Sequence, residues 1–175
     1  ISALLEAYHV LEKEKYLEIA LKSLDRLMRD CFDIVKGACH YLRDGQKGWP
    51  GFLADAVSLA RANLDAYETT AEKTYLDNAI HIMEFAQERF AAPDGGFYDV
   101  VADETMPPPT RVRHKPFHDN ILAIEVFSRL YNYTTDSAFL EAAATMLAVF
   151  EKTVKEMLSK GLGNFAAGYA IATMY

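Results

Sequence analysis

The sequence lacks the features that mark several classes of protein. Its 175 residues include only two cysteines, too few for a disulfide framework or for the spaced pairs of a typical zinc site. No run of about 18 apolar residues occurs, so no membrane-spanning helix is expected. The formal net charge is −7, and an acidic chain without a basic block binds nucleic acid and anionic membranes poorly. We therefore expect neither nucleic acid nor a membrane as a partner.

The remaining composition is that of a folded domain. Apolar residues make up 51% of the chain and charged residues 25%, which predicts one ordered domain over residues 1–175. Cys31 lies on an apolar helical stripe and is expected to pack in the core, which fits a reduced, cytoplasmic setting. The chain opens at Ile1 in a helical pattern and ends at Tyr175 in an apolar stretch. We expect it to be a piece cut from a longer protein.

An internal repeat organises the chain. Two aromatic residues eight positions apart occur three times, and the second always opens the pattern aromatic-Leu-x-x-Ala. The repeat recurs at intervals of 59 and 64 residues. Its three pairs are Tyr8 with Tyr16, Tyr67 with Tyr75, and Tyr131 with Phe139. Such self-similarity is typical of arrays of helical hairpins that cover one another's apolar faces.

The segments between these aromatics follow the period of an amphipathic helix. Apolar residues recur every three or four positions over 75–90 and 139–158, and helices starting near 14 and 52 follow the same step. The segment from Pro116 to Tyr133 is apolar nearly all round, which predicts a helix buried on several sides. With shorter pieces at 1–10 and 165–175, about seven helices are expected.

The predicted connections alternate between short and long. Near the short turns, Thr69 with Glu72 fits a capping box, and Asp136 or Ser137 can cap the next helix. The long connections run over about 32–50 and 92–115, and within the second one 97–101 is expected to pair with 110–113 as a short ribbon. An array of such hairpins gives an α/α toroid when it closes and a solenoid when it stays open.

Three blocks of sequence resemble one known family: Gly51–Ala56 with Leu64–Thr70, Gly95–Asp99, and Arg113–Asn120. In this order they resemble the C-terminal α/α toroid of thioredoxin-domain-containing proteins related to spermatogenesis-associated protein 20, which is similar to the six-hairpin glycosidases and to N-acylglucosamine 2-epimerase. The resemblance implies an all-α fold of helical hairpin repeats forming part of an (α/α)6 toroid, with short β-ribbons in the long loops. It also implies a thioredoxin-like domain in the full-length chain, and sugar chemistry.

The long loops meet at one end of a hairpin array, so a pocket is expected near the helices that start at Phe52 and Phe117. Asp55 and Asp119 lie in the first turns of those helices. Glycoside hydrolysis needs two carboxylates roughly 5–9.5 Å apart, and Asp55 with Asp119 or Asp99 is a candidate pair. The alternative is that each aspartate is only a favourable first-turn charge or a cap.

Histidines offer a second kind of chemistry. Epimerisation of a sugar needs a base with a pKa near neutral, and His118 and His40 lie in or beside the long loops. The alternative is a partly buried, hydrogen-bonded histidine without a catalytic role. His114 and His118 have a spacing that suits a metal on one helix, but Pro116 breaks that helix. We expect no metal and no cofactor.

The predicted binding residues are basic or aromatic, with two more from the resembling blocks. Arg113 and Lys115 suit a sugar phosphate or carboxylate, although surface acids such as Asp103 and Glu104 offer them partners as well. Trp49, Phe52 and Tyr98 suit the apolar face of a sugar, although most aromatic residues at helical spacing belong to the core. Asp99 and Asn120 complete the set.

The sequence thus predicts a toroid that binds or processes carbohydrate at the long-loop end, with an epimerase-like or glycosidase-like reaction if it is an enzyme. The alternative is a helical-repeat module for protein interaction or structure, without catalysis. Apolar surface at 1–10 and 165–175 also predicts self-association to at least a dimer. Light scattering checks this expectation, and a clean monomer with both ends exposed to solvent contradicts it.

Overall fold

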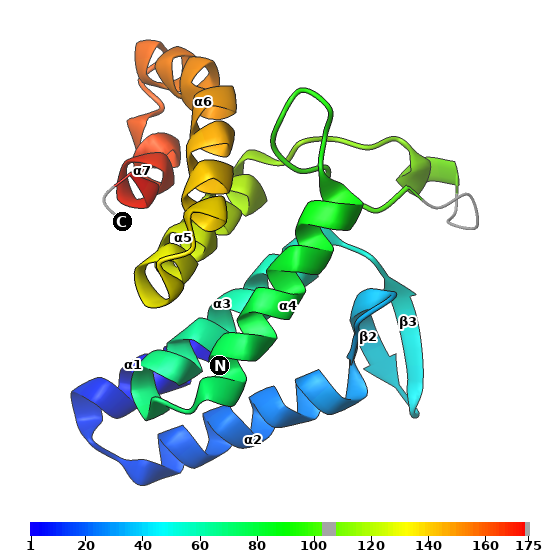
Figure 1. Cartoon of the computed structure of the whole chain (residues 1–175), viewed down its shortest axis with the longest axis vertical. Coiled ribbons are helices and arrows are strands. Elements are labelled where there is room, and N and C mark those ends of the chain that lie inside the picture. The colour runs from blue at the N-terminus through cyan, green and yellow to red at the C-terminus, as the bar shows by residue number, and fades with distance from the viewer. Residues whose placement is uncertain (103–107, 174–175) are drawn as a thin grey trace. The chain divides into compact units, whose positions relative to one another are not determined.

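The computed structural model describes residues 1–102 and 108–173, and the elements in that range confirm the predicted helical hairpins and a β-ribbon in the first long connection (Figure 1). By contact, the chain divides into two compact units that meet between Phe85 and Ala86. The helices are α1 (Ser2–Leu11), α2 (Glu14–Asp30), α3 (Leu53–Thr70), α4 (Lys73–Phe90), α5 (Phe117–Thr134), α6 (Ser137–Ser159) and α7 (Gly163–Ala172). The strands are β1 (Phe32–Asp33), β2 (Gly37–Arg43) and β3 (Gln46–Pro50), and η1 (Pro108–Arg111) is a 3-10 helix.

The three short turns share one backbone geometry. In each turn a residue in the left-handed region donates its backbone N–H to a tyrosine carbonyl four residues earlier. Those tyrosines are the first aromatics of the sequence repeat, so the repeat marks the last turn of the first helix in each hairpin. The pairs are Glu12 with Tyr8 at 2.8 Å, Ala71 with Tyr67 at 2.7 Å, and Thr135 with Tyr131 at 2.7 Å.

Only one of the two predicted helix caps is confirmed. The Asp136 carboxylate accepts from the N–H of Ala138 at 3.0 Å and caps α6. The capping box at Thr69 is wrong, because α3 continues to Thr70 and the Thr69 hydroxyl donates to the Asp65 carbonyl within that helix. The hydroxyl that accepts from the N–H of Glu72 belongs to Thr70.

In the first unit, a three-stranded antiparallel sheet of order β1-β2-β3 fills the first long connection. The strands β2 and β3 meet at Asp44-Gly45, where both residues have positive φ, as a tight two-residue hairpin turn requires. The pairing of Cys39 with Pro50 ends this hairpin next to the start of α3. Helix α3 buries most of its length in the core of the unit, including Leu53, Val57 and Leu64.

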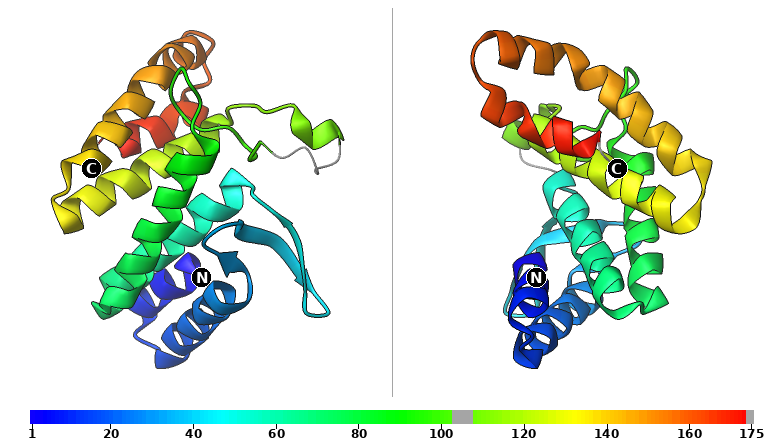
Figure 2. Two further views of the ribbon diagram at one scale, coloured as in Figure 1. Left: turned by 45° about the vertical axis from the view of Figure 1, so that its right-hand side comes forward. Right: turned by 90° about the vertical axis from the view of Figure 1, so that its left-hand side faces the viewer.

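In the second unit, α5, α6 and α7 pack side by side (Figure 2). The prediction that the segment near 116–133 is a helix buried on several sides is confirmed, because Ile121, Ile124, Val126 and Leu130 are all buried. The Phe127 ring lies 6.0 Å from that of Phe97 and 6.2 Å from that of Phe139, between centroids. This aromatic cluster fixes the long loop after α4 against α5.

The second long connection is not the ribbon that the sequence predicted. Thr110 and Arg111 belong to η1, which follows from Pro108 and Pro109, since proline lacks an N–H and its fixed φ suits a tight turn. The loop after α4 instead forms a bridge between Ala91 and Phe97, and the N–H of Asp99 donates to the carbonyl of His114. Asp103 and Glu104, proposed as partners of the basic cluster, lie outside the described residues.

Among the described residues, none of the helices combines the length and the hydropathy that crossing a bilayer requires.

Candidate functional site

The first unit brings a histidine and an aspartate together. The imidazole Nδ1 of His40, on β2, lies 2.9 Å from a carboxylate oxygen of Asp55, in the first turn of α3. The Phe52 ring lies 4.9 Å from the imidazole, between centroids, and packs beside it. The side chain of His40 is 53% exposed and that of Asp55 is 24% exposed. The aspartate is therefore the buried member of the pair, and the imidazole is the member that reaches solvent.

The surroundings of Asp55 act on its pKa in two directions. Burial raises the pKa, while the hydrogen bond and the charge of His40 lower it, and burial has the larger effect. The pKa of Asp55 therefore lies above its ordinary value. The position of Asp55 in the first turn of α3 also puts it near the positive end of the helix dipole, which favours the ionised carboxylate.

A cavity of about 420 Å³ opens beside this pair. This volume lies within the roughly 300–1,000 Å³ that is usual for small-molecule sites. His40, Asp55 and Ser58 supply polar groups to its wall, and Cys31 and Cys39 supply thiols. The rest of the wall is mostly apolar and comes from Leu27, Ala38, Leu59 and Ala62, together with residues 1–3. A few convergent polar groups in an apolar cavity are typical of a small-molecule site.

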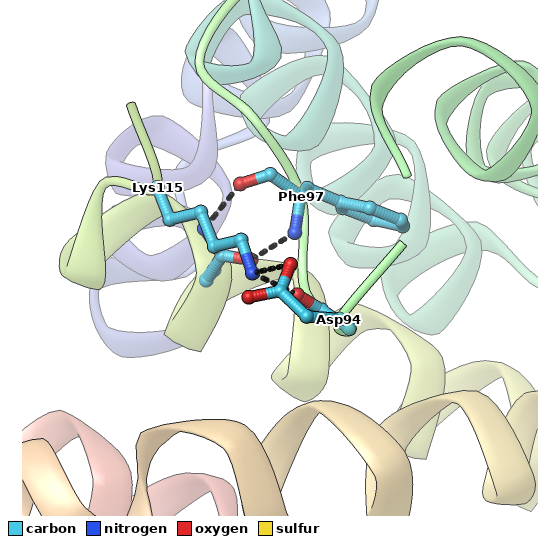
Figure 3. A network of polar contacts seen from close by, with 5 residues as sticks. Asp94, Phe97 and Lys115 are labelled. Carbon is cyan, nitrogen blue, oxygen red and sulfur yellow. Dashed lines mark hydrogen bonds and ion pairs between the residues drawn. The ribbon is translucent and has the colours of Figure 1, made fainter. Parts of the chain in front are cut away.

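In the second unit, two residues of the block Arg113–Asn120 hold the loop after α4 (Figure 3). The Lys115 ammonium donates to the Asp94 carboxylate and to the Gly95 carbonyl, the latter at 2.7 Å. The hydrogen bond from Lys115 lowers the pKa of Asp94. The Asn120 side chain is fully buried, accepts from the N–H of Phe97 at 2.7 Å and donates to its carbonyl at 3.0 Å. Both side chains therefore fasten backbone.

Three more of the predicted binding residues lie along the same loop. The Arg113 guanidinium stacks on the Tyr98 ring, 3.7 Å from its centroid. The Asp99 carboxylate accepts from the N–H of His114 at 2.8 Å, and the N–H of Asp99 donates to the carbonyl of that histidine. The Arg113 guanidinium and the Tyr98 ring form a half-exposed surface. Asp99 instead joins two backbone segments, its own and that of His114.

The remaining predicted residues are distributed between the two units. Trp49 is 51% exposed on β3, where its ring meets Tyr41 edge-on at 6.3 Å and its φ of 36° is unusual for a bulky residue. His118 is exposed in the first turn of α5, and Asp119 is half-buried beside it. Asp55 belongs to the first unit, but Asp99 and Asp119 belong to the second. The proposed carboxylate pair therefore stays a prediction.

The structure adds a contact and two thiols that sequence reasoning did not assign to a site. The sequence placed His40 near a long loop but gave it no partner, because its aspartate lies 15 residues away on another element. The sequence predicts core packing for Cys31 and assigns no role to Cys39. The only sequence signal for either feature is the Asp-Gly turn at 44–45, which sets the register of β2 against β3 and so turns His40 toward the start of α3.

The arrangement can perform proton transfer. When Nδ1 donates to Asp55, the tautomer is fixed and Nε2 keeps its lone pair for a proton in the cavity. Within residues 1–102 and 108–173, no cluster of three or more histidine, cysteine, aspartate or glutamate side chains could hold a metal ion. The chemistry that His40 and Asp55 offer is acid–base chemistry, because a neutral imidazole can take up a proton and the carboxylate can stabilise the cation that forms.

No protein-family model and no curated protein matches the sequence. Solved structures do match the fold. A family 76 glycoside hydrolase from a bovine Bacteroides thetaiotaomicron strain aligns with 86% of this chain and 33% of its own, at 19% identity and a TM-score of 0.71. A cellobiose 2-epimerase from Bacillus thermoamylovorans aligns with 87% of this chain and 39% of its own, at 16% identity and a TM-score of 0.72.

A sugar epimerase from a ruminal bacterium is also similar, at 15% identity and a TM-score of 0.70 over 87% of this chain and 40% of its own. At these identities the likeness shows the fold alone. The chain is all-α and forms part of an (α/α)6 toroid, as the sequence predicted. It spans between about a third and two fifths of the length of these three proteins.

Proposed function

We propose that the chain is part of a carbohydrate-processing toroid and that its first unit binds a sugar in the cavity beside His40 and Asp55. The observation that carries the proposal is the 2.9 Å contact between His40 and Asp55 at the wall of that cavity. The structural neighbours support it, because they are a glycoside hydrolase and sugar epimerases. The class of reaction we favour is acid–base catalysis by the imidazole.

In the proposed reaction, His40 is the group that moves the proton. Asp55 accepts from Nδ1, orients the ring and stabilises the imidazolium that forms when Nε2 takes up a proton. The proton can come from the carbon next to a sugar carbonyl, as epimerisation requires, or from a hydroxyl. Trp49 and Phe52 do not belong to the cavity wall, but Phe52 packs beside the imidazole and the Trp49 ring is exposed on β3. We therefore propose both rings as additional apolar surfaces for a pyranose face.

The second unit keeps the other proposed residues. Arg113 on Tyr98 is the best placed cation for a sugar phosphate, because Lys115 already bonds to Asp94. His118 and Asp119 in the first turn of α5 stay proposed catalytic residues, and Asp99 and Asn120 stay proposed binding residues. We also propose that residues 1–175 form one domain. We propose further that the full-length protein belongs to the family that the sequence resembles and contains a thioredoxin-like domain. Self-association stays a prediction, and Val10 and Ile171 are exposed apolar residues near the two ends.

Thermal unfolding of the chain with a panel of free sugars, oligosaccharides and sugar phosphates tests the proposal. At least one compound is expected to raise the Tm, because a ligand that binds the folded state stabilises it by mass action. The increase should shrink or vanish in His40→Gln and in Trp49→Ala. His81→Gln is the matched control, since this histidine is exposed on α4 and does not line the cavity.

A flat response over the whole panel contradicts the proposal and favours the interaction module. A shift that survives His40→Gln and Trp49→Ala but disappears in Arg113→Gln moves the binding site to the second unit. In that case the carbohydrate proposal holds and the assignment to the cavity of the first unit fails.

A further inference from the structure

The two cysteines lie directly opposite each other at the end of a strand pair. Strands β1 and β2 pair antiparallel, with Phe32 opposite Ala38 and Asp33 opposite Gly37. One further step in the same register places Cys31 opposite Cys39, and the N–H of Cys39 donates to the carbonyl of Cys31 at 2.9 Å. Only this one bond joins the two backbones, because the N–H of Cys31 donates to the Leu27 carbonyl of α2 at 2.8 Å. Opposite residues in antiparallel strands have Cα atoms about 4.5–5.5 Å apart. A disulfide spans about 4.4–6.8 Å between Cα atoms, so the backbone separation already suits one.

The two side chains are also in contact. Burial, and after it the interaction with the neighbouring Cys31 thiol, raises the pKa of Cys39 to about 11. Both residues are free cysteines, 7% and 8% exposed. Both nevertheless line the cavity of about 420 Å³ beside His40. A small reagent that enters the cavity therefore meets the two sulfur atoms together.

From this geometry we propose that Cys31 and Cys39 form a reversible intramolecular disulfide, a modification site whose co-reactant is a small-molecule disulfide such as oxidised glutathione. The thiolate of Cys31 attacks one sulfur of the reagent and releases one glutathione thiolate, which leaves a mixed disulfide on Cys31. The Cys39 thiol loses its proton to solvent, attacks the Cys31 sulfur and releases the second glutathione. Two protein thiols are oxidised, one reagent disulfide is reduced to two thiols, and no further oxidant is needed.

The raised pKa of Cys39 affects the rate of this reaction. A thiol held protonated attacks slowly, because the thiolate is the nucleophile. Closure by Cys39 should therefore accelerate as the pH rises toward 11. The new bond joins the end of α2 to β2 immediately before His40. Oxidation therefore cross-links two segments of the cavity wall next to the imidazole.

The test equilibrates the native 175-residue chain with mixtures of reduced and oxidised glutathione at pH 8, followed by alkylation with iodoacetamide and mass spectrometry of peptides. The oxidising mixtures are expected to give a product that has lost two hydrogen atoms, carries no alkyl group and joins the peptides of Cys31 and Cys39. Dithiothreitol should restore two alkylatable thiols. In Cys39→Ser, the expected product is a glutathione adduct on Cys31 in place of the internal bond.

Two results overturn the proposal. One is a native chain whose thiols both remain alkylatable in fully oxidised glutathione at pH 8 and at pH 9. The other is a chain that collects glutathione adducts without an internal bond. Neither readout uses a sugar, so the disulfide can fail while the proposed function holds, and the reverse is equally possible.

Discussion

Replacing His40 with glutamine is expected to lower the kcat/KM of sugar turnover by about 10²- to 10⁴-fold, the usual contribution of one general acid–base group. Glutamine keeps the size and a hydrogen-bond donor to Asp55, but it cannot exchange a proton near neutral pH. The loss should therefore appear mainly in kcat, with a smaller change in KM. Steady-state kinetics on the sugar that gives the largest thermal shift provide the measurement.

The Asp55→Asn variant tests how the imidazole is held. The amide can still accept from Nδ1, but it cannot stabilise a cationic ring, so kcat should fall while the fold persists.

The raised pKa of Asp55 also has a consequence for stability. Its folded-state pKa lies above its unfolded value, so the stabilisation that this group contributes is complete below the unfolded pKa and is lost as the pH rises through the folded pKa. Urea unfolding at several pH values should show this downward slope in the wild type and a flatter profile in Asp55→Asn.

Matched histidine variants decide whether His40 is the base. His81→Gln, on the exposed face of α4, should leave kcat/KM unchanged, and His118→Gln should do the same if His40 carries the reaction. A large loss in His118→Gln together with full activity in His40→Gln would transfer the role to the first turn of α5. That result would also restore Asp119 as the more plausible neighbour in catalysis.

The second large effect concerns Asn120. We expect Asn120→Ala to lower the free energy of unfolding by about 2–6 kcal/mol, because each of the two buried backbone groups left without a partner costs about 1–3 kcal/mol. The side chain is fully buried and is bonded to both the N–H and the carbonyl of Phe97. Its removal leaves both groups unpaired and frees the loop that places Tyr98. Urea denaturation followed by circular dichroism measures the change.

Asn132→Ala is the control, since this asparagine is exposed on the same helix and should change stability by less than about 0.5 kcal/mol. Asn120→Asp separates packing from bonding, because a carboxylate can still accept from Phe97 but cannot donate to its carbonyl and adds a buried charge. Its loss of stability should be at least as large as that of the alanine variant. Equal stability of Asn120→Ala and Asn132→Ala, with sugar binding lost only in the former, would make Asn120 a binding residue.

The helices could be predicted from the sequence because their signal is local. Apolar residues at every third or fourth position predicted the ends of α4 and α6 to within a few residues. The near-continuous apolar character of 116–133 did the same for α5 and correctly indicated its burial. The predicted Thr69 cap is wrong because α3 continues to Thr70, and the Thr69 hydroxyl bonds to the Asp65 carbonyl within α3. The ribbon near 110–113 failed because strand propensity gave way to the two prolines of η1.

The site was harder to predict because its contacts are not local. His40 and Asp55 meet only after β2 and β3 pair in the correct register, and periodicity carries no information on that register. Lys115 and Asn120 were selected as binding residues because they are polar and belong to a specific block. The structure shows that their polar groups first satisfy the backbone of residues 95 and 97. A polar residue in a distinctive motif can therefore be distinctive because it shapes a loop.

The short turns at Glu12, Ala71 and Thr135 have the same backbone bond although their three residues have nothing chemical in common. The reversal of chain direction thus rests on a hydrogen bond between main-chain atoms, which a change of side chain does not remove. Mutations can accumulate at these corners while each hairpin keeps its course. Similarity of fold can therefore persist in such a chain after similarity of sequence has been lost.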